Sequence, residues 1–348
     1  MLENFFGNEA AVSTLLEMRE ASRIPQTILL AGPQGVGKAT LVRRFAALAL
    51  WANDAAVAQM ENDDLSLAHN RETIAEREKL PSEKRAEDPF FLQSYPDFVT
   101  FAPEGPLRQI SIQQIRTLKD QSQLMPSQGQ RRVFLIDQID RANEQAANSL
   151  LKVLEEPPEH LLIFMTAENP YDLLPTIRSR SVTIRMNLLE DESIHAFLKQ
   201  RGADHPERRA RLGAGSPGMA ISWDLEVYDK RRAAMLALLE VASRRAPFGS
   251  WIKHVESISA SKSEKLEAYL DVLYLLLEDL LLLGHGYTDL RNSDIAGQLR
   301  SIADAVSFPW LRHAVQLTDE MERQLRRNIQ KGIALDAFAL ELREKALI

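Results

Sequence analysis

The sequence contains no cysteine, so disulfide bonds and thiolate metal ligands are both excluded. It has no basic excess either: 49 acidic residues exceed 42 basic ones, and a formal charge of −7 gives no field for non-specific DNA binding. The seven histidines are scattered, with no two at metal-ligand spacing on one helix face. Any contact with nucleic acid must therefore be local or supplied by partner proteins, and no metal site is expected.

Long uncharged apolar runs are absent as well. The most apolar stretch, residues 268–284, carries Asp271, Glu278 and Asp279 and is shorter than the roughly 20 apolar residues of a membrane-spanning helix. A buried helix in an all-α domain is the better interpretation. The N-terminus lacks the basic start and apolar core of a signal peptide. We expect a cytoplasmic protein that makes no membrane contact.

Alternating strand and helix signals in the first half predict an α/β domain. Apolar runs at 26–31, 132–136 and 161–166 suit the strands of a parallel sheet buried on both faces. A helix is expected over 40–51. Another should follow Asn143, an N-cap for the segment AANSLLKVLEE, which ends before two prolines. These patterns place an α/β core in the first half.

The domain organisation follows from where the strand signals end. We expect a core over residues 1–187, a small helical domain over 188–224 and an all-helical domain over 225–348. Within the core, about 52–94 form a charged insertion, in which 61–88 carry nine acidic and five basic side chains. Such a segment predicts an exposed helical or mobile insertion outside the core.

The sharpest motif is Gly32-Pro-Gln-Gly-Val-Gly-Lys38, a match to G-x-x-x-x-G-K between a predicted strand and helix. Gly32, Gly35 and Gly37 would let the loop wrap phosphate oxygens, towards which its N–H groups and the helix N-terminus direct positive potential. Lys38 would reach the β and γ phosphates. A chance glycine turn is the weaker interpretation, because the motif has the right neighbours.

The rest of the nucleotide site is degenerate. The Mg²⁺-binding hydroxyl is missing at Ala39, and Thr40 comes one residue late, which turns its side chain by about 100° on a helix. Asp137 ends a Walker B-like strand and could hold the metal's water shell, but Gln138 follows where a glutamate base is usual. We expect hydrolysis to be lost and leave open whether ATP or ADP binds weakly; an active enzyme that tolerates both changes is the alternative.

Three segments together resemble the δ′ family of bacterial DNA polymerase III clamp-loader subunits, which are AAA+ proteins. They are SRIPQTILLAGPQGVGKATLVRRFA, YPDFVTFAPEG and IDRANEQAANSLLKVLEEPPEHLLIFMTAENPYDLLPTIRSRS. The resemblance covers about residues 1–220. It implies a RecA-like core with a parallel sheet, a small helical lid and an all-α collar. It also implies assembly with γ/τ and δ subunits, and work on a sliding clamp and primed DNA.

The resemblance implies roles for further residues. Ser179-Arg180-Ser181 matches the family's Ser-Arg-Cys motif, which makes Arg180 a trans-acting arginine finger for a neighbour's ATP; whether Arg178 shares this role stays open. Thr166 falls at the sensor-1 position. Met219 stands where active subunits carry a basic sensor-2 residue. The family's four-cysteine zinc module has no counterpart, so no zinc is expected.

The resulting hypothesis is a stator subunit of the DNA polymerase III holoenzyme that completes a neighbour's ATP site and is not itself an active ATPase. The first alternative is a catalytically active ATPase subunit of the γ/τ type. The second is a P-loop kinase or small-molecule ligase, for which the sequence offers no acceptor pocket and no carboxylate base near the phosphates.

Overall fold

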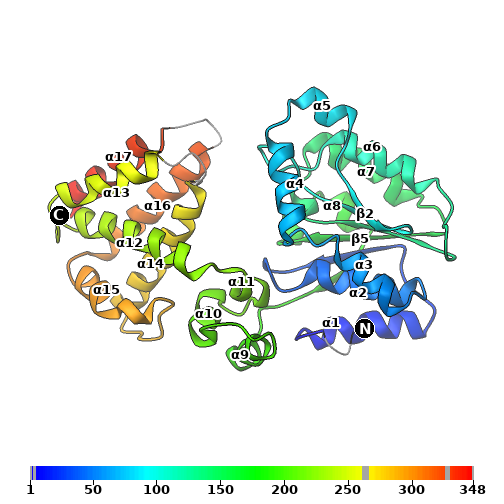
Figure 1. Cartoon of the computed structure of the whole chain (residues 1–348), viewed down its shortest axis with the longest axis horizontal. Coiled ribbons are helices and arrows are strands. Elements are labelled where there is room, and N and C mark those ends of the chain that lie inside the picture. Colours follow the sequence, from blue (N-terminus) through cyan, green and yellow to red (C-terminus); the bar gives the residue numbers. More distant parts are fainter. Residues whose placement is uncertain (1, 3–4, 261–265, 326–329, 347–348) are drawn as a thin grey trace. The chain divides into compact units, whose positions relative to one another are not determined.

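The computed structural model describes residues 2, 5–260, 266–325 and 330–346. The chain divides into two compact units, one of Met1–Asp204 with Gly215–Met219 and one of His205–Ala214 with Ala220–Ile348. All strands of the described residues lie in the first unit, and the second is helical. The predicted order, an α/β region followed by helices, is therefore confirmed (Figure 1).

A six-stranded sheet forms the centre of the first unit, in the order β2-β3-β4-β5-β1-β6. The strands are β1 (Thr27–Ala31), β2 (Leu92–Tyr95), β3 (Phe98–Phe101), β4 (Arg132–Ile136), β5 (Leu161–Ala167) and β6 (Val182–Arg185). Five of them run parallel, and only the edge strand β2 is antiparallel to its neighbour, β3. The predicted strands at 26–31, 132–136 and 161–166 are thus confirmed to within one residue at each end.

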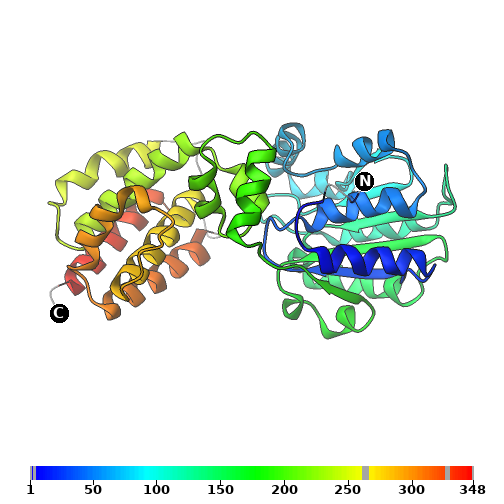
Figure 2. The ribbon, with the colours of Figure 1, turned by 90° about the horizontal axis from the view of Figure 1, so that it is seen from below.

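Helices cover both faces of this sheet, which explains its continuous apolar strands. One face carries α1 (Glu9–Glu20), α2 (Lys38–Ala49) and α3 (Asp54–Glu61); the other carries α6 (Ile112–Ser122), α7 (Glu144–Glu155) and α8 (Pro175–Arg178). In β1, Ile28 and Leu30 join the first core, and Leu29 and Ala31 join the second. A strand buried on both faces is apolar at nearly every position, in place of the alternation seen when one face meets water. Figure 2 shows α1 and α2 in blue, lying side by side.

Local capping sets where these helices begin. The Asn143 side chain accepts a hydrogen bond from Ala146 N at 2.8 Å, which confirms it as the N-cap of α7. A capping box between Ser111 and Gln114 starts α6. Helix α7 ends at Glu155, two residues before Pro157, as the sequence predicts.

The charged insertion departs from its prediction. It forms α3, α4 (Ala68–Glu78) and α5 (Ser82–Glu87), so it is helical as expected. However, the prediction that it lies exposed and outside the core is wrong for part of its length, because Asp63, Asn70, Ile74 and Arg77 are buried. Ile74 packs in a small apolar cluster with two residues of the sheet region, Phe90 and Ala102.

Ion pairs and hydrogen bonds dock the insertion on the sheet domain. Arg77 Nε lies 2.6 Å from Glu104 Oε2, and both side chains are nearly buried. The Asp63 carboxylate accepts from Ser94 N at 3.0 Å, and Asp64 pairs with Arg43 of α2. A charged side chain can be buried when it has an ionic or hydrogen-bonding partner. In the insertion, Glu104 and Arg43 outside it supply such partners, so a high density of charge does not mean that the segment is exposed.

The second unit is an all-helical bundle. Its helices are α10 (Pro206–Gly213), α12 (Leu225–Ala242), α13 (Gly249–Ala260), α14 (Glu267–Gly284), α15 (Ala296–Ala303), α16 (Phe308–Leu325) and α17 (Lys331–Lys345), with α9 (Asp191–Gln200) in the first unit and α11 (Pro217–Ser222) spanning the boundary. The helical character predicted for 225–348 is confirmed where the structure describes it; 261–265, 326–329 and 347–348 lie outside the described residues.

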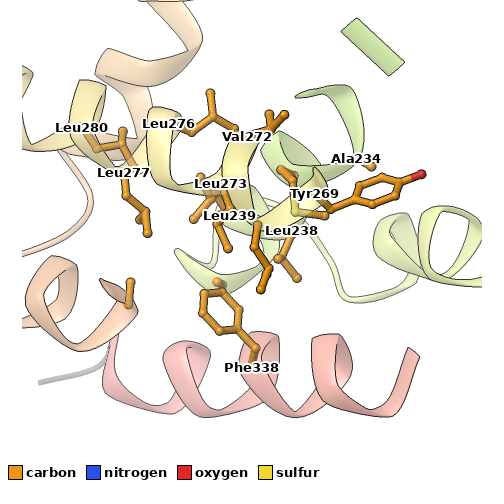
Figure 3. Close-up of a cluster of buried hydrophobic side chains, with 14 of the residues drawn as sticks. Ala234, Leu238, Leu239, Tyr269, Val272, Leu273, Leu276, Leu277, Leu280 and Phe338 are labelled. Carbon is orange, nitrogen blue, oxygen red and sulfur yellow. The ribbon is translucent and has the colours of Figure 1, made fainter. Parts of the chain in front are cut away.

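The apolar stretch at 268–284 is the central helix of this bundle, as the sequence indicates. Leu273 and Leu276 of α14 are fully buried, and Figure 3 shows Leu273 close to Leu239 of α12, above Phe338 of α17. Among the described residues, no helix is long and apolar enough to cross a membrane. The hydrophobicity of α14 therefore serves packing.

Candidate functional site

The glycine loop lies at the carboxyl edge of the sheet, where ligands bind in open α/β folds. Gly32 follows β1 directly, and its N–H donates to Ala167 O at the end of β5. Gly37 is the N-cap of α2 with φ 95°, a conformation in which glycine avoids strain. The predicted strand–loop–helix arrangement is present, with α2 beginning at Lys38 and not at residue 40.

Lys38 bonds to the loop itself. Its Nζ donates to Gly32 O at 2.5 Å and to Pro33 O at 2.7 Å. Burial lowers the pKa of Lys38, against the nearby carboxylates of Glu168 and Asp137, which raise it. The lysine is thus positioned within the loop, as the motif predicts, with carbonyl oxygens as its partners in the chain.

The segment Gly215–Met219 packs against the glycine loop. Ser216 Oγ donates to Gln34 O at 2.9 Å, and Gly218 N donates to Gly35 O at 2.9 Å. Gly35 has φ 74°, and a Cβ there would lie 2.3 Å from Ser216 Oγ. Any larger residue at this position would push the two segments apart, so sequence and structure both require glycine here.

Asp137 and Thr166 lie together beside the loop. Thr166 Oγ1 donates to Asp137 Oδ1 at 2.5 Å and accepts from Gln138 N at 2.8 Å. Asp137 follows β4 and Thr166 lies in the neighbouring β5, so both reach the same sheet edge. Burial raises the pKa of Asp137, which the Thr166 hydrogen bond and the charges of Arg43 and Lys38 partly offset.

The residues at this edge do not fit the magnesium ion that ATP hydrolysis needs. Ala39 offers no oxygen, and the Thr40 hydroxyl accepts from Arg43 NH2 at 3.3 Å. Asp137 uses one carboxylate oxygen to bind Thr166. Arg43, with an exposed fraction of 2%, donates to Thr40 and pairs with Asp64, a network that sequence analysis did not identify.

The insertion does not fit a zinc site either. The chain has no cysteine, and in the part of it that the structure describes no three His, Asp or Glu side chains group as a metal site would require. The insertion is held by ion pairs and apolar contacts instead.

Arg180 lies at the opposite edge of the sheet from the loop. It precedes β6 by two residues, and β6 runs parallel to β1 with Val182 level with Ile28. Gly32, by contrast, follows the far end of β1. At about 3.3 Å per strand residue, the four residue levels from Val182 to the level of Gly32 span about 13 Å, and Arg180 lies in the turn that precedes Val182. Arg180 contacts Glu155 at the end of α7, close to the start of β1, so the arginine and the phosphate loop lie towards opposite ends of the parallel strands.

Arg180 is exposed and has partners within its own unit. Its NH2 lies 2.7 Å from Glu155 Oε1, and its NH1 donates to Thr176 O at 3.1 Å. Arg178 is more buried and its guanidinium lies over the ring of Tyr171, 5.0 Å from the centroid. Sequence analysis did not identify Glu155 as a partner, although it lies within one of the three segments that carry the family resemblance.

Comparison with known proteins identifies a family to which this sequence is similar. The family described as "DNA polymerase III, delta subunit" matches residues 7–190, more than half of the chain. The δ′ subunit of Escherichia coli K12 is 28% identical over 217 residues, 62% of this chain and 63% of that protein. The Bacillus subtilis δ′ subunit is 26% identical over 262 residues, 72% of this chain and 77% of that protein. A Mycobacterium tuberculosis γ/τ subunit is 29% identical over 62% of this chain and 35% of its own length.

Structural likeness is weaker than the sequence match. A γ-subunit-related protein of Thermotoga maritima aligns over 95% of this chain and 99% of its own, with a TM-score of 0.44 and 19% identity. The assignment therefore depends on sequence, and the match spans less than two thirds of the E. coli relative. With a family match over more than half of the chain and two δ′ relatives, the chain belongs to the DNA polymerase III δ′ subunit family.

Proposed function

We propose that this chain is a δ′-like stator of the replicative clamp loader. It assembles with γ/τ and δ subunits in the cytoplasm, and the complex loads a sliding clamp on primed DNA. Its own part is to supply Arg180 to the ATP site of a neighbour. In this proposal residues 1–187 form the AAA+ core, 188–224 the lid and 225–348 the collar through which subunits associate.

The chemistry of the chain's own site supports the proposal. Hydrolysis needs a metal ligand after Lys38 and a base after Asp137, and Ala39 and Gln138 supply neither. Met219 adds no positive charge in the segment that packs on the loop. Gly32, Gly35, Gly37, Lys38, Thr40, Asp137 and Thr166 remain a degenerate phosphate site, at which weak binding of ATP or ADP stays a prediction.

The position of Arg180 is the single observation that carries the proposal. The exposed guanidinium lies near the amino ends of the strands, and its own phosphate loop follows their carboxyl ends, which favours a phosphate bound by another chain. Arginine suits this task because its planar fork meets phosphate oxygens with two parallel hydrogen bonds and stays charged.

The test is the ATPase of a complex assembled from this chain with γ/τ and δ subunits. Arg180→Ala should leave assembly intact and reduce DNA-stimulated turnover, since a trans arginine typically supplies about 10³–10⁵ in rate at the site it serves. The loss is partial if other sites have their own arginines. Arg180→Lys should restore little, because it keeps the charge but not the fork. Unchanged turnover and clamp loading by a complex with Arg180→Ala would refute the proposal.

The alternative is an active ATPase of the γ/τ type, which the sequence similarity to γ/τ subunits supports. It predicts magnesium-dependent ATP turnover by this chain in the absence of partners. That measurement separates the two functions without a reconstituted complex.

A further inference from the structure

We propose that Glu155, the last residue of α7, is a positioning residue that orients the guanidinium of Arg180 for a neighbour's phosphate. The inference rests on the proposed function of Arg180 and adds a second residue to it. It also assigns a role to one of the two glutamates in the segment AANSLLKVLEEPP. Core packing does not explain an exposed carboxylate at this position.

The geometry leaves Arg180 both held and available. Glu155 Oε1 lies 2.7 Å from NH2, and NH1 donates to Thr176 O at 3.1 Å and to Ser179 Oγ at 3.5 Å. A guanidinium has five N–H donors, and these three bonds use three of them. The Arg180 side chain keeps an exposed fraction of 34%. The remaining donors can therefore meet a phosphate while Glu155 still holds the other side of the fork.

Glu155 is itself well anchored, as a positioning residue must be. It ends α7, whose Leu150 and Leu154 are buried in the core beneath. The proline turn that follows is tied to the sheet, because Gln26 Nε2 donates to Pro158 O at 2.9 Å just before β1. The carboxylate thus projects from a rigid helix end and not from a free loop.

Arg180 needs such support because its own element is short. Helix α8 spans only Pro175–Arg178, and Arg180 lies beyond its end. On an exposed segment of this kind, a long side chain samples many rotamers, and ordering it at the moment of reaction costs rate. An ion pair with Glu155 holds the Arg180 side chain in one orientation before the reaction and so reduces this cost. The Glu155 carboxylate is itself 49% exposed and stays in contact with water.

The experiment compares Glu155→Ala, Glu155→Gln and Glu156→Ala in the assembled complex. Glu156 is the matched control, because it is the next residue, is exposed and loses the same charge. The measured quantity is the Arg180-dependent turnover, defined as the kcat of the complex minus that of the complex with Arg180→Ala. Assembly is checked by gel filtration and KM for ATP is determined for each variant.

We expect Glu155→Ala to lower the Arg180-dependent turnover about two- to five-fold, the range that an exposed ion pair supplies. KM should stay unchanged, because the lost contact acts in the transition state. Glu155→Gln should retain most of the turnover, since its amide oxygen still accepts from Arg180, and Glu156→Ala should match the unmodified complex. In an Arg180→Ala background, Glu155→Ala should have no further effect.

Two results would overturn the inference, and they differ from failure of the proposed function. If Arg180→Ala lowers turnover while Glu155→Ala does not, Arg180 acts without Glu155. If Glu155→Ala raises KM or acts equally in the Arg180→Ala background, Glu155 has only a structural role. If Arg180→Ala itself changes nothing, the proposed function fails, and this inference fails with it.

Discussion

Single residues determine what the phosphate loop can do, and the decisive ones are those that lack an oxygen or a charge. Lys38 bonds to carbonyl oxygens of the loop, and Asp137 binds Thr166 beside it, so the structure brings together the residues of the predicted nucleotide site. Ala39 and Gln138 remove the two groups that would make it hydrolytic. The loop residues that remain contribute hydrogen bonds to the fold, so they have a structural role that does not depend on hydrolysis.

The first prediction concerns this site. The purified chain should show negligible magnesium-dependent ATP hydrolysis, because no side chain after Lys38 can hold the metal and Gln138 cannot accept a proton. The measurement is phosphate release at saturating ATP, with Lys38→Ala as the control variant. Robust turnover that Lys38→Ala abolishes would mean that the site is active and would favour the γ/τ-type alternative.

At this scale the sequence predicted motif residues well and partners poorly. Gly32, Lys38 and Asp137 could be located because phosphate binding imposes a spacing on nearby residues. Glu155 and Arg43 could not, because each acts through a partner that lies 25 or 21 residues away along the chain. An ordinary charged residue at a helix end gives no local signal of what it contacts.

At the scale of elements, the insertion shows why charge alone misled the prediction. Strands β1, β4 and β5 were identifiable because a strand buried on both faces is a nearly continuous apolar run. In α4, Arg77 occupies a buried position, which its pairing with Glu104 makes possible. The sequence records the charge of Arg77 but not the buried carboxylate that meets it.

This pairing gives a stability prediction. Arg77→Ala should lower the free energy of unfolding by roughly 3–5 kcal/mol, because it leaves the nearly buried Glu104 carboxylate without its partner. Arg108→Ala is the matched control, because it breaks the ion pair between Arg108 and Glu78. The Arg108 side chain is 44% exposed, so the loss should cost about 0–1 kcal/mol. Urea denaturation of both variants measures the difference. Equal costs would show that the insertion is not docked through Arg77.

At the scale of the whole molecule, the chain consists of two units with separate cores. The first is built around the sheet, and the second around α14, where Leu273 and Leu276 are fully buried. Helix α14 also carries a buried carboxylate, Asp279, which accepts from Arg291 N at 2.8 Å and Asn292 N at 2.9 Å. Burial raises the pKa of Asp279, against these hydrogen bonds, which lower it. The charge that interrupts the apolar stretch thus anchors the segment after the helix.

The last prediction uses Asp279 to test whether the two units unfold independently. Asp279→Ala should destabilise the second unit by roughly 3–5 kcal/mol, because it leaves the buried N–H and amide of Asn292 and the partly buried N–H of Arg291 without their acceptor. Glu278→Ala, its exposed neighbour paired with Arg291, should cost about 0–1 kcal/mol. Since chains with two cores need not unfold in one step, calorimetry should resolve two transitions. Asp279→Ala should lower only one of them, and Arg77→Ala only the other. A single transition that both variants lower equally would mean that the two cores unfold as one cooperative whole.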